Sequence, residues 1–182
     1  AVHHHLIRRG KRMRASIICQ TGAAWDVHHF ATLIGYGAGC IYPYLAYASV
    51  ARMTVDGSIR ELDVKTALTN YKKTLEAGIL KIMSKMGISV VASYRGAQIF
   101  ESLGLDQEVI ETCFAGTSCK VPGVGFEALG NDMLRLHASA YGEHGSSTLD
   151  IGGFFKFRRG GENHAFSPEV LSAMHTMVHS GE

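Results

Sequence analysis

The stretch from Lys81 to Glu101 constrains the fold most, because it predicts three different elements within one short segment. It begins as a basic, methionine-rich helix end, breaks at Gly87, continues as a β-branched strand over 88–91, and turns at 93–96 into an amphipathic helix. This succession is typical of a parallel α/β unit. Ligands of such units bind beyond the carboxyl ends of the strands. The candidate site residues are therefore Ser93, Tyr94, Arg95 and Gly96.

A second α/β pattern precedes this stretch. The apolar run over 15–19 suits a buried parallel strand, and Asp26 can cap a helix that ends near Ile34. A second strand is predicted over 39–41, and Pro43 opens a helix that runs to Met53. Strand, helix, strand and helix in this order imply a right-handed parallel crossover. The predicted fold class is therefore α/β, built from parallel strand-helix units.

A long helix capped by Asp63 carries a broad apolar stripe and bridges the two patterns, with a boundary near 78–87. Downstream, helices are predicted over 106–114 and 126–141 and after Ser167, with loops over 116–125 and 142–150. Residues 151–159 mix small, aromatic and basic side chains, and a turn exposes Arg158 and Arg159. This segment is either a hairpin that docks between domains or an anion site for a substrate carboxylate, and we favour docking.

Composition excludes several classes of protein. With 182 residues, 46% of them hydrophobic and 19% charged, the chain can bury a core and is too apolar to be disordered. A formal charge of +2 provides no strong field for nucleic acid or an anionic membrane, so neither is predicted as a partner. One basic cluster is expected to be a solvated or subunit-facing surface, and it comprises Arg8, Arg9, Lys11, Arg12 and Arg14.

No metal site is predicted. Cys19, Cys40, Cys113 and Cys119 lie far apart or among apolar residues, which favours reduced thiols in a cytoplasm or plastid stroma. The pair Cys113 and Cys119 lacks a third ligand at a suitable spacing. Three consecutive histidines over 3–5 point about 100° apart on a helix, so they cannot bind one metal ion together.

Several long motifs resemble the large chain of glutamate synthase. Residues 83–89 and 93–101 resemble the start of its flavin-binding barrel, while VHHHLIR over 2–8, VHHFA over 27–31 and GYG over 35–37 resemble the end of its central domain. The resemblance covers essentially the whole chain and is more specific than a short glycine pattern. It implies two domain pieces: 1–80, the end of the central domain with the bridging helix, and 81–182, the start of an incomplete TIM-type (β/α)8 barrel.

The resemblance also implies roles for single residues. Ser89 would lie in the first barrel strand, and Glu101 would orient ammonia or relay a proton as the catalytic acid. The implied cofactor-binding residues are Ser89, Ser93, Tyr94, Arg95, Gly96 and Ala97. An ordinary exposed helix glutamate is the other interpretation of Glu101. Five residues separate Cys113 from Cys119, as between two cluster cysteines of the family, but the surrounding residues do not match the family's cluster loop.

Glutamate synthases transfer the amide nitrogen of glutamine to 2-oxoglutarate with FMN and an iron-sulfur cluster. Electrons come from ferredoxin or a nicotinamide-linked small subunit. The chain starts without an initiator methionine and lacks the amidase nucleophile, the cluster loop and most of the barrel. The segment alone is therefore expected to bind no cofactor and to be inactive, with the rest of the large chain as its partner. The alternative is a non-catalytic interaction module that docks on a separate barrel chain.

Overall fold

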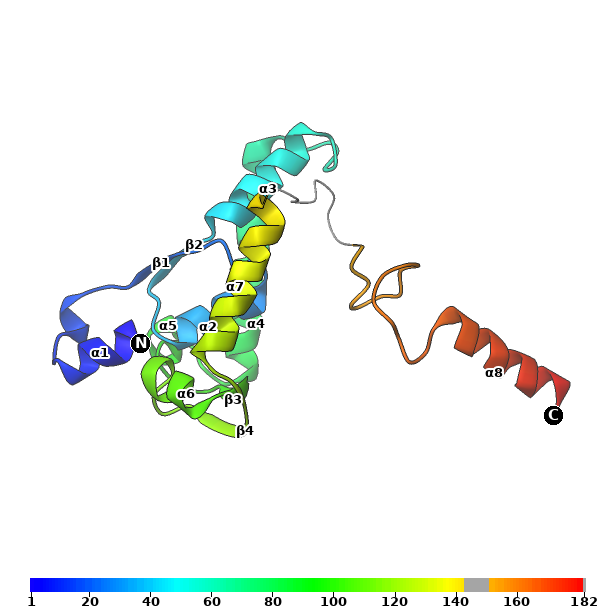
Figure 1. Ribbon diagram of the computed structural model, residues 1–182. Coiled ribbons are helices and arrows are strands. Elements are labelled where there is room, and N and C mark those ends of the chain that lie inside the picture. Colours follow the sequence, from blue (N-terminus) through cyan, green and yellow to red (C-terminus); the bar gives the residue numbers. More distant parts are fainter. Residues whose placement is uncertain (143–150, 182) are drawn as a thin grey trace. The chain divides into compact units, whose positions relative to one another are not determined.

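The computed structural model describes residues 1–142 and 151–181. Their contacts divide the chain into two compact units, Ala1–Leu129 and Gly130–Glu182. The first unit contains both sheets and nearly all of the buried residues. It is mixed α/β, as the sequence predicts, and Figure 1 shows its strands and helices.

The first sheet is the crossover that the sequence predicts. Strand β1, Ile18–Gln20, pairs in parallel with β2, Cys40–Tyr42, and helix α2, Val27–Gly35, connects them. Asp26 caps α2 because its Oδ1 accepts hydrogen bonds from the backbone N–H groups of His28 and His29. The element types are correct, and the strand boundaries differ from the predicted ones by one to three residues.

A second parallel pair follows further along the chain. Strand β3, Glu101–Leu105, pairs with β4, Ser118–Val124, and helix α6, Gln107–Cys113, connects them. The register starts with Glu101 opposite Ser118 and shifts twice before Leu105 reaches Val124. Pro122 contributes to this irregularity because it has no backbone N–H to donate to the ladder.

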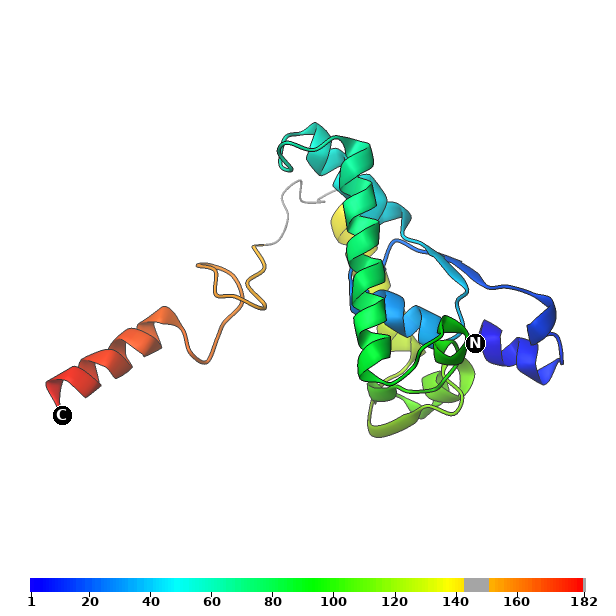
Figure 2. The ribbon, with the colours of Figure 1, turned by 180° about the vertical axis from the view of Figure 1, so that it is seen from behind.

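Two longer helices complete the framework of the first unit. Helix α3, Tyr44–Val55, packs on α4, Val64–Lys85, and α4 also packs on α2. Figure 2 shows α4 as the long helix across this unit. Asp63 caps α4, as predicted, by accepting a hydrogen bond of 2.7 Å from the N–H of Thr66.

The core of the first unit consists of two clusters that share α2 and α4. Ala24, Phe30 and Leu75 form the first cluster. Ala31, Met83 and Tyr94 form the second. Leu75 and Met83 are eight residues apart, about two turns of α4, and therefore face the same side. The side chain of Ile79 lies between them along the helix and packs against both clusters.

The predicted strand over 88–91 is wrong. The chain bends over 88–90 and forms one helical turn, α5, Val91–Tyr94. The turn brings the Tyr94 side chain into the second cluster, whereas Val90 and Val91 stay about half exposed. Tertiary packing thus overrides the β propensity of these residues. Ser89, predicted in the first barrel strand, is exposed and lies outside any strand.

Two further element predictions are wrong. The segment after Gly96 is expected to be an amphipathic helix, but it contains the strand β3. The apolar run in this segment is short, and a short run fits the periodicity of a helix as well as that of a strand. The segment 116–125 is expected to be a loop, but it contains the strand β4. Its proline, Pro122, disfavours a strand when the sequence is considered alone. Both errors have one cause: each strand is stabilised by pairing with the other, which neither local sequence specifies.

The remaining elements of the first unit lie near its amino end. They are α1, Val2–Arg8, and a 3-10 helix, η1, Arg12–Arg14. Helix α7, Phe126–Tyr141, runs from the first unit into the second and has the predicted bounds. Except for Gly142, the loop predicted over 142–150 lies outside the described residues.

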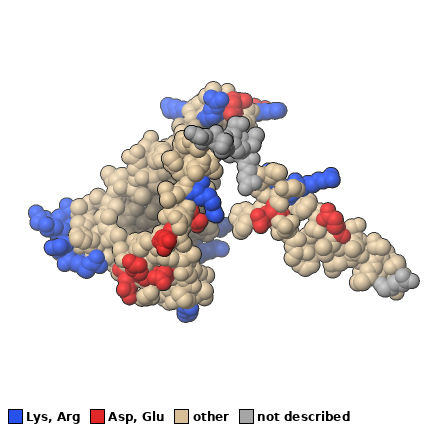
Figure 3. All heavy atoms as spheres, in the orientation of Figure 1, with Lys and Arg blue, Asp and Glu red and all other residues tan. Residues whose placement is uncertain are grey.

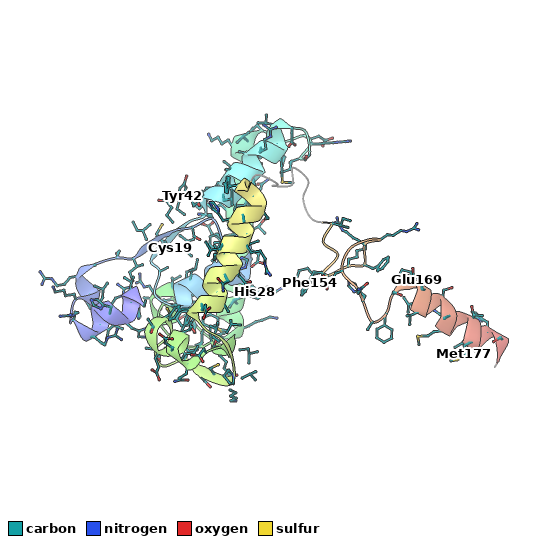
Figure 4. All side chains as sticks on the ribbon, in the orientation of Figure 1. Cys19, His28, Tyr42, Phe154, Glu169 and Met177 are labelled. Carbon is teal, nitrogen blue, oxygen red and sulfur yellow. The ribbon has the colours of Figure 1, made fainter. Side chains whose placement is uncertain are left out.

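The second unit contains few buried side chains. Helix α8, Pro168–Ser180, is capped by Ser167, as predicted, and all of its residues are exposed. Residues 151–164 form a compact loop in which the N–H of Glu162 donates to the carbonyl of Gly152. Figure 4 labels Phe154 in this loop and Met177 on α8. Among the described residues, no helix has the length and apolarity that crossing a membrane requires.

Candidate functional site

The six predicted cofactor-binding residues do not share one cavity. Ser89, Ser93 and Ala97 are exposed, and Tyr94 is fully buried. Of the six, Arg95 lines a pocket whose other lining residues come mainly from α1 and the segment through η1. Because α5 replaces the expected strand, the turn at 93–96 precedes β3 and does not follow a strand. The reason for expecting a ligand there is therefore lost, and the flavin contacts of these residues stay a prediction.

Tyr94 is a core residue whose hydroxyl lacks a hydrogen bond. Its side chain is 0% exposed and packs in the second cluster with Ala31 and Met83. Within the described part of the chain, no group is placed to bond its hydroxyl. Burial raises the pKa of Tyr94 above its ordinary value, so the phenol is neutral at pH 7. The ring contributes packing, and its hydroxyl has no ligand-binding geometry.

Glu101 is a strand residue, neither a helix residue nor a buried acid. It begins β3, and its Oε1 lies 3.6 Å from Nζ of Lys120 on β4. Both side chains are well exposed, so the pair contributes little to stability. Glu101 lies at the amino end of its strand, whereas Asp106 and Gly125 follow the carboxyl ends of β3 and β4. Asp106 already caps α6 by accepting from the N–H of Glu108.

A junction around His3 joins three segments of the first unit. Nε of Arg12 donates a hydrogen bond of 2.9 Å to Nδ1 of His3. The same guanidinium donates to the carbonyl of Ala15 at 2.7 Å and to that of Gly37 at 2.9 Å. All three kinds of guanidinium nitrogen are thus used to hold the backbone and the imidazole. We call His3, Arg12, Gly37 and Gly96 the His3 junction.

Close backbone approach explains the two glycines of the His3 junction. Gly37 follows α2 with φ of 106°, and a Cβ there would overlap the imidazole of His3. Gly96 follows α5 with φ of 77°, and a Cβ there would lie 3.1 Å from Nε2 of His3. The N–H of Gly96 also donates to the carbonyl of Gly35. The ends of α2 and α5 are therefore fixed against α1.

A pocket opens beside the His3 junction, with a volume of about 470 Å³. Its lining residues come from α1, from the segment through η1 and from α5, and they are His3, Arg12, Met13, Arg14, Ala15, Ser16, Ala92 and Arg95. Three of the eight are arginines, and none is acidic. We call it the arginine pocket. Figure 3 shows Lys and Arg side chains gathered over this amino-terminal part of the first unit.

The sequence signals only part of this arrangement. The basic cluster over 8–14 is visible as a run of charge, and it is predicted as a solvated surface. Arg14 is exposed as that prediction implies, but Arg12 is half-buried and structural. The contact between this cluster and Arg95 joins residues far apart in the sequence, and no local motif marks it.

The cysteines do not assemble into a site. All four are free thiols, and within the two described ranges no three His, Cys, Asp or Glu side chains are grouped to hold a metal ion. Cys119 on β4 contacts the carbonyls of Leu105 and Val121 at 3.4 and 3.3 Å. Figure 4 shows Cys19 on the first sheet, near Tyr42 of the neighbouring strand.

Comparison with known proteins identifies the family. The glutamate synthase central domain family matches residues 1–106. Ferredoxin-dependent glutamate synthase 2 of Synechocystis sp. is 46% identical over 98% of this chain and 12% of its own length. The NADPH-type glutamate synthase large chain of Bacillus subtilis is 45% identical over 96% of this chain and 11% of its own.

The similarity extends to eukaryotic proteins. The NADH-type glutamate synthase of Saccharomyces cerevisiae is 43% identical over 97% of this chain and 9% of its own length. The chain thus spans about a tenth of the length of these relatives, and the similarity continues well past residue 106. Both the central-domain match and this nearly complete coverage agree with the resemblance in the motifs. The chain belongs to the glutamate synthase family.

Proposed function

We propose that this chain supplies the end of the central domain and the start of the flavin-binding barrel to a glutamate synthase large chain. Residues 1–80 are the proposed central-domain piece, which holds most of the bridging helix α4, and 81–182, which begin with its last turn, are the proposed barrel piece. The observation that carries this proposal is 46% identity over 98% of the chain to one relative. The parallel unit β3–α6–β4 is the kind of unit from which a (β/α)8 barrel is built.

The proposed activity of the complete large chain is that of its relatives. It transfers the amide nitrogen of glutamine to 2-oxoglutarate and forms two molecules of glutamate, with FMN, an iron-sulfur cluster, and ferredoxin or a nicotinamide-linked subunit as electron donor. The proposed location is the cytoplasm or a plastid stroma. The segment alone is proposed to be inactive, because the sheets found in its described residues have two strands each, far fewer than a complete barrel needs.

The residues of this segment do not form a flavin cradle by themselves. Tyr94 is enclosed in the core. Arg95 lines the arginine pocket, whose lining does not include Ser89 or Ser93. Flavin contacts from this segment require the strands of the complete barrel, since TIM-barrel sites combine loops from several strands.

For Glu101 we propose a role in handling ammonia. Its carboxylate is exposed at the start of β3, and its Oε1 lies 3.6 Å from Nζ of Lys120. An exposed carboxylate can accept hydrogen bonds from ammonia or relay a proton. The amino end of the strand is opposite the end at which TIM barrels carry their reaction centre. This position favours delivery of ammonia over direct contact with the reacting atoms.

A chimera tests the proposed function. The corresponding segment of the Bacillus subtilis large chain is replaced by these 182 residues, and FMN content, glutaminase turnover and glutamate formation are measured on one preparation. We expect flavin binding and glutamine-dependent synthesis within about tenfold of the parent. Glu101→Gln should keep the flavin and the glutaminase and lower synthesis roughly tenfold or more, a typical loss for proton transfer.

The matched control for Glu101 is Glu127→Gln, because Glu127 is an exposed acid in the first turn of α7. It should leave all three activities unchanged. A chimera that folds, binds FMN and hydrolyses glutamine yet forms no glutamate from 2-oxoglutarate would contradict the proposed function. Unchanged synthesis in the Glu101→Gln chimera would contradict the role of Glu101 alone.

A second candidate function is a non-catalytic module that docks on a separate barrel chain. The exposed apolar residues of the β3–β4 pair favour it, since Leu103 is 71% and Val121 56% exposed. Co-expression with a large chain that lacks this segment separates the two candidates. Recovery of synthesis from two separate chains would support docking, whereas recovery only after covalent fusion would support the continuous chain.

A further inference from the structure

We propose that the arginine pocket is a binding site for an oxyanion, a carboxylate or a phosphate group. This inference goes beyond the proposed glutamate synthase activity and does not depend on it. The pocket has a volume of about 470 Å³, which is large enough for a small metabolite or for one acidic side chain. It lies wholly within the first unit, between η1 and the end of α5.

The lining of the arginine pocket offers hydrogen-bond donors. Arg14 and Arg95 each carry a guanidinium, whose planar fork of N–H groups matches the oxygens of a carboxylate or phosphate. Ser16 adds a hydroxyl. No acidic side chain lines the pocket, and Asp26 is the first acid in the sequence. A cation would be repelled from this site, and an anion would be attracted.

His3 is fixed as a neutral donor by its bond to Arg12. An arginine Nε always carries its proton, so Nδ1 of His3 must accept in the 2.9 Å contact. The remaining nitrogen, Nε2, therefore carries the proton of the neutral ring. Burial and the charge of Arg12 lower the pKa of His3, which keeps the ring neutral at pH 7.

The two free arginines are available for a ligand. Neither Arg14 nor Arg95 takes part in any of the ion pairs found among the described residues. Arg95 lies close to Gly39, the residue before β2, since a Cβ on Gly39 would be 3.1 Å from its Nη1. Arg12 is different, because it already donates to His3, Ala15 and Gly37. Arg12 thus shapes the pocket, while Arg14 and Arg95 would contact the anion.

The pocket is also held in shape before any ligand arrives. The hydrogen bonds of Arg12 fix η1 to α1 and to the end of α2, and the N–H of Gly96 fixes the end of α5 to Gly35. A site whose walls are already in place loses less conformational entropy on binding. This distinguishes the pocket from a run of mobile surface arginines.

The test titrates the 182-residue chain with inorganic phosphate and with glutarate at constant ionic strength, using chloride as the reference anion. We expect saturable binding in the millimolar range, measured by NMR through the side-chain signals of His3, which every variant keeps. The double variant Arg14→Gln, Arg95→Gln should weaken binding about tenfold or more, since it removes both charged donors. Arg12 is left intact because it holds the fold.

The matched control removes the same charge elsewhere. Arg9→Gln with Arg52→Gln also lowers the net charge by two, but neither residue lines the pocket. This control should keep the affinity within about twofold, as expected if only the pocket residues bind the anion. If the first double variant does not fold, the single variant Arg95→Lys replaces it. This change keeps the positive charge but removes the guanidinium fork, so it should weaken anion binding without affecting the fold.

Two results would overturn the proposal: the absence of saturable binding of both anions, or an equal loss in the control double variant. The same titration on the large chain that carries this segment separates the sources of the oxyanion. Binding retained there identifies a free metabolite as the ligand. Binding lost there, but present in the separate segment, would support a group of the large chain, such as an acidic side chain, as the occupant of the site.

Discussion

Nε of Arg12 donates a hydrogen bond to Nδ1 of His3 over 2.9 Å and thereby sets the protonation of the ring. Both residues belong to the segment 3–14, whose many basic and histidine residues predict an exposed surface. In the fold they are half-buried, and together they tie α1 to the end of α2. The pair therefore stabilises the first unit as well as shaping the arginine pocket.

Arg12→Met should lower the free energy of unfolding by about 2–3 kcal/mol, because it removes three hydrogen bonds from a charged donor and leaves their acceptors unpaired. Urea unfolding followed by circular dichroism measures this. Arg9→Met is the control, since Arg9 is exposed and makes no side-chain hydrogen bond among the described residues. Equal midpoints for the two variants would show that the His3 junction adds no stability.

Stability should fall as the pH is lowered below about 6.5, the ordinary pKa of histidine. Burial lowers the pKa of His3 and of His4 in the folded chain, so the unfolded chain binds more protons in this range. This contribution is fully present above the unfolded pKa and is lost as the pH falls toward the folded values. Urea midpoints at a series of pH values measure the slope.

Replacing the shifted histidine should reduce that pH dependence. His3→Gln keeps an acceptor for Arg12 and removes the titrating group, so the slope below pH 6.5 should become shallower. A slope in His3→Gln that equals the slope of the parent chain would assign the pH dependence to other groups.

Tyr94→Phe should leave the stability unchanged or raise it by up to about 1 kcal/mol, because it removes a buried hydroxyl that has no partner in the described residues. Tyr36→Phe is the matched comparison. The hydroxyl of Tyr36 lies 2.8 Å from Oγ1 of Thr117, so its loss should cost about 1 kcal/mol. Thermal unfolding of both variants tests the difference, and a larger loss for Tyr94→Phe would reveal a bond to its hydroxyl.

Gly78→Ala should destabilise the chain by about 1–3 kcal/mol although it lies inside a helix, because the new Cβ would overlap the methyl groups of Val27. Val27 is stiff and packs in the first cluster, so it cannot move aside freely. Gly130→Ala in α7 has open space around its Cβ and should stabilise by about 1 kcal/mol from helix propensity. Chemical denaturation should show opposite signs for the two changes.

Local signals predict the capped helices of this chain well, but the helix expected after Gly96 is the strand β3. Asp26, Asp63 and Ser167 mark the starts of three helices, because their side chains bond the first free N–H groups. The strands are harder to predict. Pairing between β3 and β4 decides which residues become extended, and the sequence near either strand contains no information about its partner.

The candidate site shows the same division. A turn at 93–96 is predictable, but its place relative to the strands depends on whether 88–91 is a strand or a helical turn. Burial of Tyr94 decides this, and burial is a property of the assembled core. The arginine pocket depends on contacts between residues near 12 and near 95, which no local pattern records.

Ile79 packs against both core clusters, and this has a consequence for the cooperativity of folding. Helix α4 gives Leu75 to one cluster and Met83 to the other, so loosening either would expose the same helix to water. Amide hydrogens of α2 and α4 should therefore exchange with solvent in a single opening event. A protease that cuts between residues 80 and 81 would not release two stable domains, because the cut falls inside the helix that both cores share.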